Sequence, residues 1–263
     1  MILSDIEQRI KAKIEAIGTP LKDWDIQINY GIKTGFNDAF IIDGEKRAEL
    51  IAQDPKSEEI IRPILRGRDI KRYGYEWNDK YVIIARLESD IPNKYPAICK
   101  HLEQFKGKGK LGDNSTTKVF KRPWWAWMQE PVSYWEDFYR QKIVYPETTQ
   151  GAYFALDKNN IMLDKTCFMI VSSSENLEYL MILLSSKLYE FAYKSIFSSI
   201  ELGISGYQYN KHALIQLPIV KVSKETEKEI LFLFNNKEFQ KLDMVIYKLY
   251  NLQEKEIAFI KNI

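Results

Sequence analysis

The sequence predicts an α+β fold, in which a domain of mixed short strands lies between an N-terminal connector helix and a C-terminal helical segment. Helical spacing of apolar residues at both ends and short alternating runs between them support this prediction. The chain has 263 residues, of which 45% are hydrophobic and 28% charged, so it can bury a sizeable core. These values exclude a disordered chain, a collagen-like chain and a small disulfide-stapled scaffold.

Residues 4–17 predict the first helix. Ser4 can cap it, and Glu7 stands three residues later, as in a capping box. An apolar stripe at helical spacing consists of Ile6, Ile10, Ile14 and Ile17. The sequence at 18–20, Gly-Thr-Pro, ends the helix. We therefore expect residues 1–19 to form a connector helix, which either docks on the domain or leads to it from an upstream region.

Short strands and turns are predicted to follow. Alternation over 24–30 and apolar runs at 39–42 and 81–85 indicate strands, whereas 48–52 suits a strand or a helix start. The pair Asp43-Gly44 predicts a turn, residues 95–105 a short helix, and residues 106–122 an exposed, mobile loop. The recognisable elements here are short, as expected for α+β rather than for alternating β-α-β units.

The second half opens with aromatic residues between 124 and 139, which we assign to the core rather than to base stacking. Strands are predicted at 142–146, 154–156 and 168–171, a helix at 177–198, and a Gly/Ser/Tyr loop at 203–209. From Ser223 the pattern is helical in two or three segments. The predicted divisions are therefore 1–19, 20–222 and 223–263.

Charge is unevenly distributed along the chain. The net charge is only +2, but residues 62–122 hold 15 Lys/Arg and 7 Asp/Glu, a local excess of +8. A protein with one basic face and an acidic body gives such a pattern, and so does a solvated loop. No signal peptide is visible, and apolar runs such as 179–184 are too short to span a bilayer. We expect a cytoplasmic protein without membrane contact, with Cys99 and Cys167 reduced.

Motifs of enzymes are weak in this sequence. Residues 107–112, Gly-Lys-Gly-Lys-Leu-Gly, match a dinucleotide fingerprint but lack a preceding strand and a following helix. Neither His101 nor His212 stands in a catalytic pattern, and no Cys/His spacing suits zinc. Metal-nuclease, base-flipping and methyl-donor motifs were not found. We expect no catalytic, cofactor or metal site in this chain.

Three short segments have the chemistry of DNA binding, because Lys and Arg hold phosphates while polar side chains read base edges. The first segment, residues 33–38, has hydrogen-bond donors beside a glycine. The second, residues 66–72, holds four cations in seven residues. The third, residues 118–125, has lysines and an arginine followed by two tryptophans. We expect at least one of Arg66 and Arg68 to read a base, whereas Lys33 suits a phosphate. The candidate DNA-binding residues, with two from the loop after residue 206, are Lys33, Thr34, Asn37, Arg66, Arg68, Lys71, Arg72, Lys118, Lys121, Arg122, Tyr207 and Lys211.

The chain resembles the TaqI-like C-terminal specificity domain along nearly its whole length. The resemblance rests first on residues 20–24, on 31–42 with Gly-Ile-Lys-Thr-Gly-Phe-Asn-Asp, and on 61–73 with Leu-Arg-Gly-Arg-Asp-Ile-Lys-Arg-Tyr. Further matches occur in the expected order at 95–96, 101–102, 124–125, 142–147, 183–188, 217–218 and 243–257. Each motif is short, but together they are specific. The glycine-lysine loop at 107–112 departs from the pattern and puts contacts there in doubt.

This resemblance implies a target-recognition domain that reads duplex DNA within an adenine-N6 methyltransferase or a fused type II restriction-modification enzyme. Such proteins bind S-adenosylmethionine, and Mg²⁺ in any nuclease part, in an upstream region. This chain lacks that region, so we expect either an excised domain or a separate gene product whose partner is the methyltransferase region. The alternatives are a DNA-cleaving or other nucleic-acid enzyme subunit with an unrecognised catalytic site, and an RNA-binding protein. A metal-dependence assay on plasmid DNA separates the enzyme from the recognition module.

Overall fold

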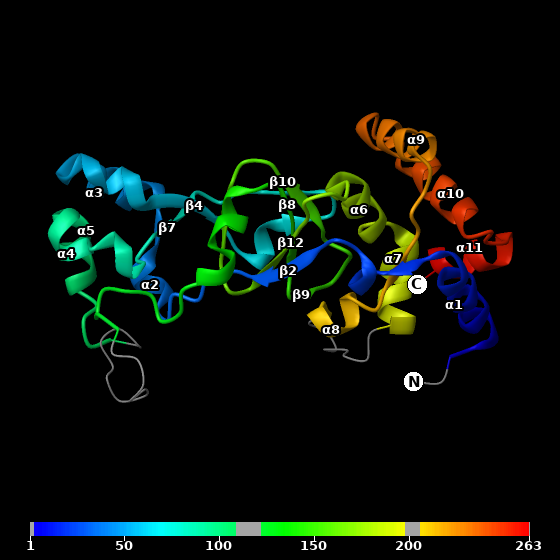
Figure 1. Ribbon diagram of the computed structural model, residues 1–263, viewed down its shortest axis with the longest axis horizontal. Helices are drawn as coiled ribbons and strands as arrows, with labels where there is room; N and C mark the ends of the chain where they lie inside the picture. The colour runs from blue at the N-terminus through cyan, green and yellow to red at the C-terminus, as the bar shows by residue number, and fades with distance from the viewer. Residues whose placement is uncertain (1–2, 109–121, 198–205, 263) are drawn as a thin grey trace.

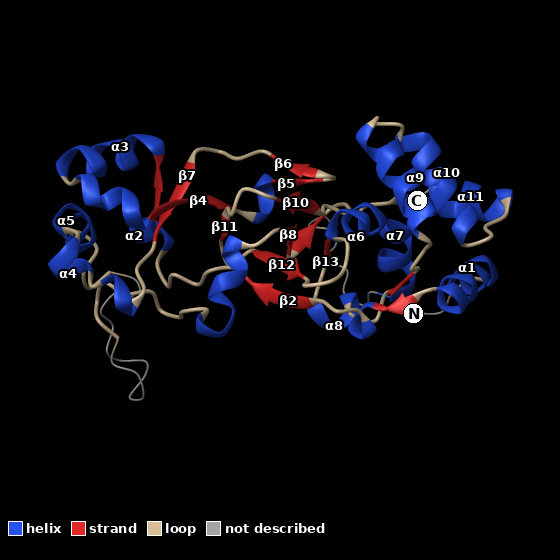
Figure 2. Cartoon of the chain, turned by 45° about the horizontal axis from the view of Figure 1, so that its top comes forward, coloured by secondary structure: helices blue, strands red, loops and turns tan. Residues whose placement is uncertain are grey.

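The computed structural model describes residues 3–108, 122–197 and 206–262. The molecule is elongated, with a four-stranded sheet in the middle, one lobe beyond each side of it, and the two termini in the same lobe (Figure 1). Helices gather in both end lobes while most strands lie between them (Figure 2). The α+β prediction is therefore confirmed.

The central sheet has the order β10-β8-β12-β2, and all its strands are antiparallel. Every residue of β8 and β12 is buried, because each strand packs on both faces. This explains why the apolar residues of both strands are consecutive rather than alternating, with Lys142 at the start of β8 as the exception. The bounds are β2 Gln27–Tyr30, β8 Lys142–Pro146, β10 Ala155–Asp157 and β12 Cys167–Val171.

A second sheet, of order β11-β4-β7-β3, lies in the lobe next to the central sheet. Its strand β11 pairs in parallel with β4, although it lies between β10 and β12 in sequence, so this excursion joins the two sheets. The strands are β3 Ile41–Asp43, β4 Ile61–Leu65, β7 Lys80–Ile83 and β11 Met162–Leu163. The helices of this lobe are α2 Asn37–Phe40, α3 Gly44–Gln53, α4 Ile91–Lys94 and α5 Pro96–Glu103.

The other lobe is helical and contains both ends of the chain (Figure 1). The capping box of α1 is present: the Ser4 hydroxyl accepts from the Glu7 amide, and the Glu7 carboxylate accepts from the Ser4 amide. The C-terminal region, predicted to be helical in two or three segments, forms α9, α10 and α11. The bounds are α1 Asp5–Ile17, α6 Leu177–Leu184, α7 Lys187–Ala192, α8 Lys211–Leu214, α9 Lys224–Asn235, α10 Phe239–Leu249 and α11 Glu254–Lys261.

Short ladders and 3-10 turns complete the fold. Three two-stranded ladders join β1 to β14, β5 to β6 and β9 to β13. Their strands are β1 Thr19–Pro20, β5 Ile70–Lys71, β6 Gly74–Tyr75, β9 Thr148–Thr149, β13 Tyr207–Gln208 and β14 Pro218–Ile219. The 3-10 segments are Leu21–Asp23, Pro55–Ile60, Gly67–Asp69, Leu87–Ser89 and Val132–Tyr139, and a π-helical turn spans Tyr193–Phe197.

Two hydrophobic clusters form the core, one on each face of the central sheet. Tyr145 and Phe168 belong to the cluster of the helical lobe, whereas Val144 and Met169, their neighbours on β8 and β12, belong to the other. Ile10 of α1 lies in the first cluster together with residues of the C-terminal helices. Because these segments share one core, the division at residues 19 and 222 stays a prediction.

Local signals failed at three places. Residues 39–40, expected in a strand, close the short helix α2, and strand β3 begins only at Ile41. The Asp43-Gly44 turn is instead the start of α3, where the Asp43 carboxylate accepts from the Lys46 amide at 3.0 Å. The helix predicted over 177–198 breaks after Leu184, because Ser186 caps a new helix, α7, through its hydroxyl.

Candidate nucleic-acid interface

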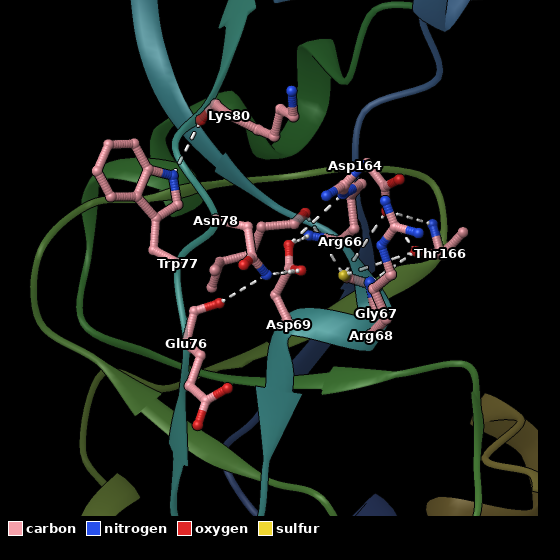
Figure 3. Close-up of polar contacts among 12 residues, drawn as sticks. Arg66, Gly67, Arg68, Asp69, Glu76, Trp77, Asn78, Lys80, Asp164 and Thr166 are labelled. Atoms are coloured by element: carbon pink, nitrogen blue, oxygen red, sulfur yellow. Dashed lines mark hydrogen bonds and ion pairs between the residues drawn. The ribbon is translucent and has the colours of Figure 1, made fainter. Parts of the chain in front are cut away.

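A tight turn after β4 carries the central part of the basic segment. The turn covers Gly67–Asp69 and is followed directly by β5. The Asp69 carboxylate, fully buried, accepts from the Arg66 amide and from the Asn78 side-chain amide, both at 2.8 Å (Figure 3). A buried carboxylate needs such donors, since an unpaired one is costly. Asp69 therefore holds the backbone of the turn at Arg66 and ties it to Asn78.

A second anchor comes from the central sheet. The Thr166 hydroxyl accepts from the Gly67 amide at 2.8 Å and itself donates to the Asp164 carboxylate (Figure 3). A Cβ atom on Gly67 would stand 3.1 Å from Thr166 and 3.2 Å from Pro146, so this position favours glycine. The backbone of the turn is consequently held by hydrogen bonds on both sides, with Asp69 and with Thr166.

The turn borders an open groove with a volume of about 530 Å³. Arg66 lies beside Asp69, with Nε 3.6 Å from the carboxylate, and its side chain is partly exposed. Arg68 is exposed, and within residues 3–108, 122–197 and 206–262 its guanidinium has no hydrogen bond or ion pair. Seven residues line the groove: Arg66, Gly67, Arg68, Glu147, Thr148, Asp164 and Thr166.

Asp164 lines this groove and is almost fully buried. Burial raises the pKa of its carboxyl, while hydrogen bonds from Thr166 and, more weakly, the charge of Arg66 lower it. A phosphate placed close to this carboxyl would disfavour its charged form further, whereas a hydrogen-bond donor would favour it. The part of the groove next to Asp164 therefore suits hydrogen-bond donors better than anions.

Lys33 lines a second, smaller pocket of about 150 Å³, with Tyr30, Gly31, Gln129, Pro131 and Tyr134. The Lys33 ammonium stands 5.0 Å above the ring centroid of Tyr30. Tyr30, the last residue of β2, pairs with Phe168 near the start of β12. Cys167, the first residue of β12, pairs with Pro146, the last residue of β8. The pocket and the groove therefore lie at the same end of the central sheet.

Thr34 and Asn37 serve local structure. Thr34 is only 2% exposed, and its hydroxyl donates to the Asn37 side-chain oxygen at 2.7 Å just where α2 begins. The Asn37 side chain is partly exposed. DNA contact by either residue stays a prediction, and Asn37 is the one with a side chain near the surface.

Several of the predicted cations are engaged within the protein. The Arg72 guanidinium donates to the Ser185 carbonyl at 2.7 Å, and Arg122 pairs with Glu130 at 3.1 Å. Lys71 donates to the Arg68 carbonyl at 2.9 Å but keeps an exposed side chain. Part of the basic charge of residues 62–122 is thus engaged within the fold, by the Glu130 carboxylate and by backbone carbonyls.

The remaining candidates differ in their placement. Tyr207 is buried, with the Lys194 ammonium 4.8 Å from its ring centroid, and Lys211 donates to the Ile28 carbonyl at 3.0 Å. Lys118 and Lys121 lie outside the described residues, as does most of the loop expected at 106–122. Contacts by these four residues with DNA stay predictions.

Besides Gly67 of the turn, four groove residues were not candidates from the sequence: Glu147, Thr148, Asp164 and Thr166. Glu147 directly follows β8 and Thr148 begins β9, whereas Asp164 and Thr166 lie in the short connection between β11 and β12. Polar side chains at the ends of buried strands are a recognisable signal, because loops on a rigid sheet often carry binding residues. Their meeting with Arg68 depends on strand pairing, which the local sequence does not reveal.

The described parts of the chain contain no group of three or more His, Cys, Asp or Glu side chains arranged to hold a metal ion. In the same parts, no helix combines the length and the apolar character needed to cross a lipid bilayer.

Comparison with known families identifies the class of this domain. The model of the TaqI-like C-terminal specificity domain matches residues 62–219, which include the turn and every residue lining the groove. The chain belongs to this family of specificity domains. The resemblance inferred from the sequence is therefore confirmed.

Solved structures show the same fold in larger proteins. The chain is similar to the type IIL restriction-modification enzyme MmeI, solved in complex with DNA, with a TM-score of 0.59 and 16% identity over 93% of this chain and 36% of that one. It is also similar to the type IIG restriction endonuclease BpuSI, with a TM-score of 0.61 and 14% identity over 98% of this chain and 32% of that one. The chain thus spans about a third of these structures. No curated protein matches the sequence.

Proposed function

We propose that this chain is the sequence-specific duplex DNA recognition module of a restriction-modification adenine methyltransferase, without catalytic activity of its own. The observation that carries the proposal is Arg68, exposed and unpaired in the described part of the chain, on a turn anchored at Asp69 and Thr166. An arginine on a turn whose backbone is held by hydrogen bonds suits readout of DNA, because the backbone at this position need not become ordered on binding.

Family membership supports the proposal, since the matched domain is a specificity domain. The similar enzyme MmeI was solved with DNA, and the likeness covers 93% of this chain. We extend the proposal to a partner, a methyltransferase region that supplies S-adenosylmethionine binding and catalysis, with Mg²⁺ in any nuclease part, and to a cytoplasmic location. If this is correct, the chain incubated alone with DNA, S-adenosylmethionine and Mg²⁺ yields neither methylated nor cleaved product. Either product, lost on mutation of this chain, would favour an enzyme.

Duplex binding by the full chain is expected to weaken steeply with salt. Each phosphate contact contributes about 0.9 to the slope of log K against log salt. Lys33 stands at the groove end of the central sheet, so Lys33→Ala should lower this slope by about one and weaken all sequences equally. Titration of a mixed-sequence duplex by fluorescence anisotropy at several salt concentrations measures both.

A matched control is Lys158→Ala. Lys158 follows β10 at the opposite end of the central sheet, because Asp157 pairs with Lys142, the first residue of β8. Its side chain is exposed and pairs only loosely with Glu178, at 3.6 Å. The control should bind like the unmodified chain. A slope that is flat, or no binding at low salt, contradicts the proposed function.

A further inference from the structure

The groove contains carboxylates beside its arginines. Glu147 and Asp164 line it together with Arg66 and Arg68. Among the described residues neither carboxylate lies within 4.0 Å of a basic side chain, so these charges do not neutralise one another directly. A site built for phosphate alone would gain nothing from carboxylates, because they repel an anion at short range. The groove therefore offers donors and acceptors side by side.

Glu147 is held as an oriented acceptor. Its amide donates to the Thr166 carbonyl and its carbonyl accepts from the Tyr209 amide, at 2.9 and 2.8 Å. Gln208 of β13 donates to carboxylate oxygen Oε1 at 2.9 Å. The other oxygen, Oε2, has no partner in the described part of the chain, so it is available to a donor in the groove.

Asp164 has a different role. Its Oδ1 accepts from both the amide and the hydroxyl of Thr166, and that hydroxyl accepts from the Gly67 amide. Asp164 and Thr166 are thus positioning residues for the arginine turn. The carboxylate that is partly exposed and has a free oxygen is that of Glu147.

An arginine and a carboxylate side by side are complementary to the hydrogen-bonding groups of a G·C base pair. Arginine donates two hydrogen bonds to O6 and N7 of guanine, and a carboxylate accepts from the N4 amino group of cytosine. Both base edges appear together in the major groove at a G·C pair. Resting on the proposed function, we propose that this groove reads a G·C base pair from the major groove, with Arg68 on guanine and Glu147 on the amino group of its cytosine.

The first test is selection from a randomised duplex library by the full chain at low salt, followed by sequencing of the bound DNA. The unmodified chain should enrich a motif with a fixed G·C position. Arg68→Ala and Glu147→Ala should each relax that same position by about 5- to 150-fold and leave the others unchanged. Lys158→Ala should enrich the original motif.

The second test changes the DNA, so it does not depend on the folding of a variant. In the selected duplex, 7-deazaguanine removes the N7 acceptor, and N4-methylcytosine places a methyl group where the carboxylate would accept. Each analogue at the proposed position should weaken binding of the unmodified chain. The 7-deazaguanine effect should vanish in Arg68→Ala and the N4-methylcytosine effect in Glu147→Ala, as expected for direct contacts in a double-mutant cycle.

The outcomes separate this inference from the proposed function. If Arg68→Ala weakens all sequences equally and lowers the salt slope by about one, Arg68 is a phosphate contact and the inference is overturned while DNA binding stands. Binding without sequence preference, or a G·C preference that both variants and both analogues leave intact, also overturns it. If the unmodified chain binds no duplex, the proposed function falls, and the inference with it.

Discussion

Asp157→Asn is expected to lower the free energy of unfolding by about 3–5 kcal/mol, because it leaves a buried ammonium without its counter-charge. Asp157 and Lys142 are both fully buried, and their carboxylate and ammonium lie 2.5 Å apart across β10 and β8. Burial lowers the pKa of Lys142, and the charge of Asp157 opposes that shift. Removal of the charge should therefore disfavour protonated Lys142 in the folded state. Urea unfolding followed by circular dichroism measures the loss.

Two controls make this prediction specific. Lys158→Ala breaks an exposed ion pair with Glu178 and should cost less than about 1 kcal/mol. Lys142→Met in the Asp157→Asn background removes the uncompensated charge and should recover part of the loss. A loss below about 1 kcal/mol for Asp157→Asn would contradict the assignment. Because the pair lies at the end of the sheet opposite the groove, the folded variant should still bind duplex DNA.

The sequence predicted the parts of the fold that local chemistry determines. Ser4 and Glu7 identified the start of α1, and the apolar runs identified β8 and β12, whose burial on both faces leaves little freedom of residue type. Residues 39–40 were misassigned, because a short apolar run has no period of its own. Caps and long apolar runs are thus the reliable signals in this chain.

The sequence predicted the arginines of the groove but not its carboxylates. Arg66 and Arg68 were found, because four cations in one turn are unusual without an anion nearby. Glu147 and Asp164 were not, because strand pairing brings them to the turn from about 80 and 100 residues away. The charge count of residues 62–122 also overstated the free basic surface, since Arg72 and Arg122 find partners within the fold.

Gly31→Ala is expected to destabilise the chain by about 1–3 kcal/mol or more and to abolish specific DNA binding. Its Cβ atom would stand 1.9 Å from the Asp164 carbonyl oxygen and 2.6 Å from the carbonyl carbon, so backbone must move. The Gly31 amide donates to the Cys167 carbonyl at 2.9 Å, which holds the two segments together. Displacement of Asp164 should shift Thr166, which holds Gly67 at the arginine turn.

Gly74→Ala is the matched control for this substitution. Gly74 lies in β6, where an added Cβ would meet no atom within 4 Å, so its stability should change by no more than about 0.5–1 kcal/mol. Thermal melting and duplex binding are measured on all three proteins, with binding read at a temperature where each is folded. If folded Gly31→Ala binds the selected duplex as the unmodified chain does, the contact between Gly31 and Asp164 does not position the groove. Loss of binding in Gly31→Ala but not in Gly74→Ala would show that the close backbone contact between Gly31 and Asp164 positions Arg68. This contact lies where the end of β2 meets the segment that leads into β12.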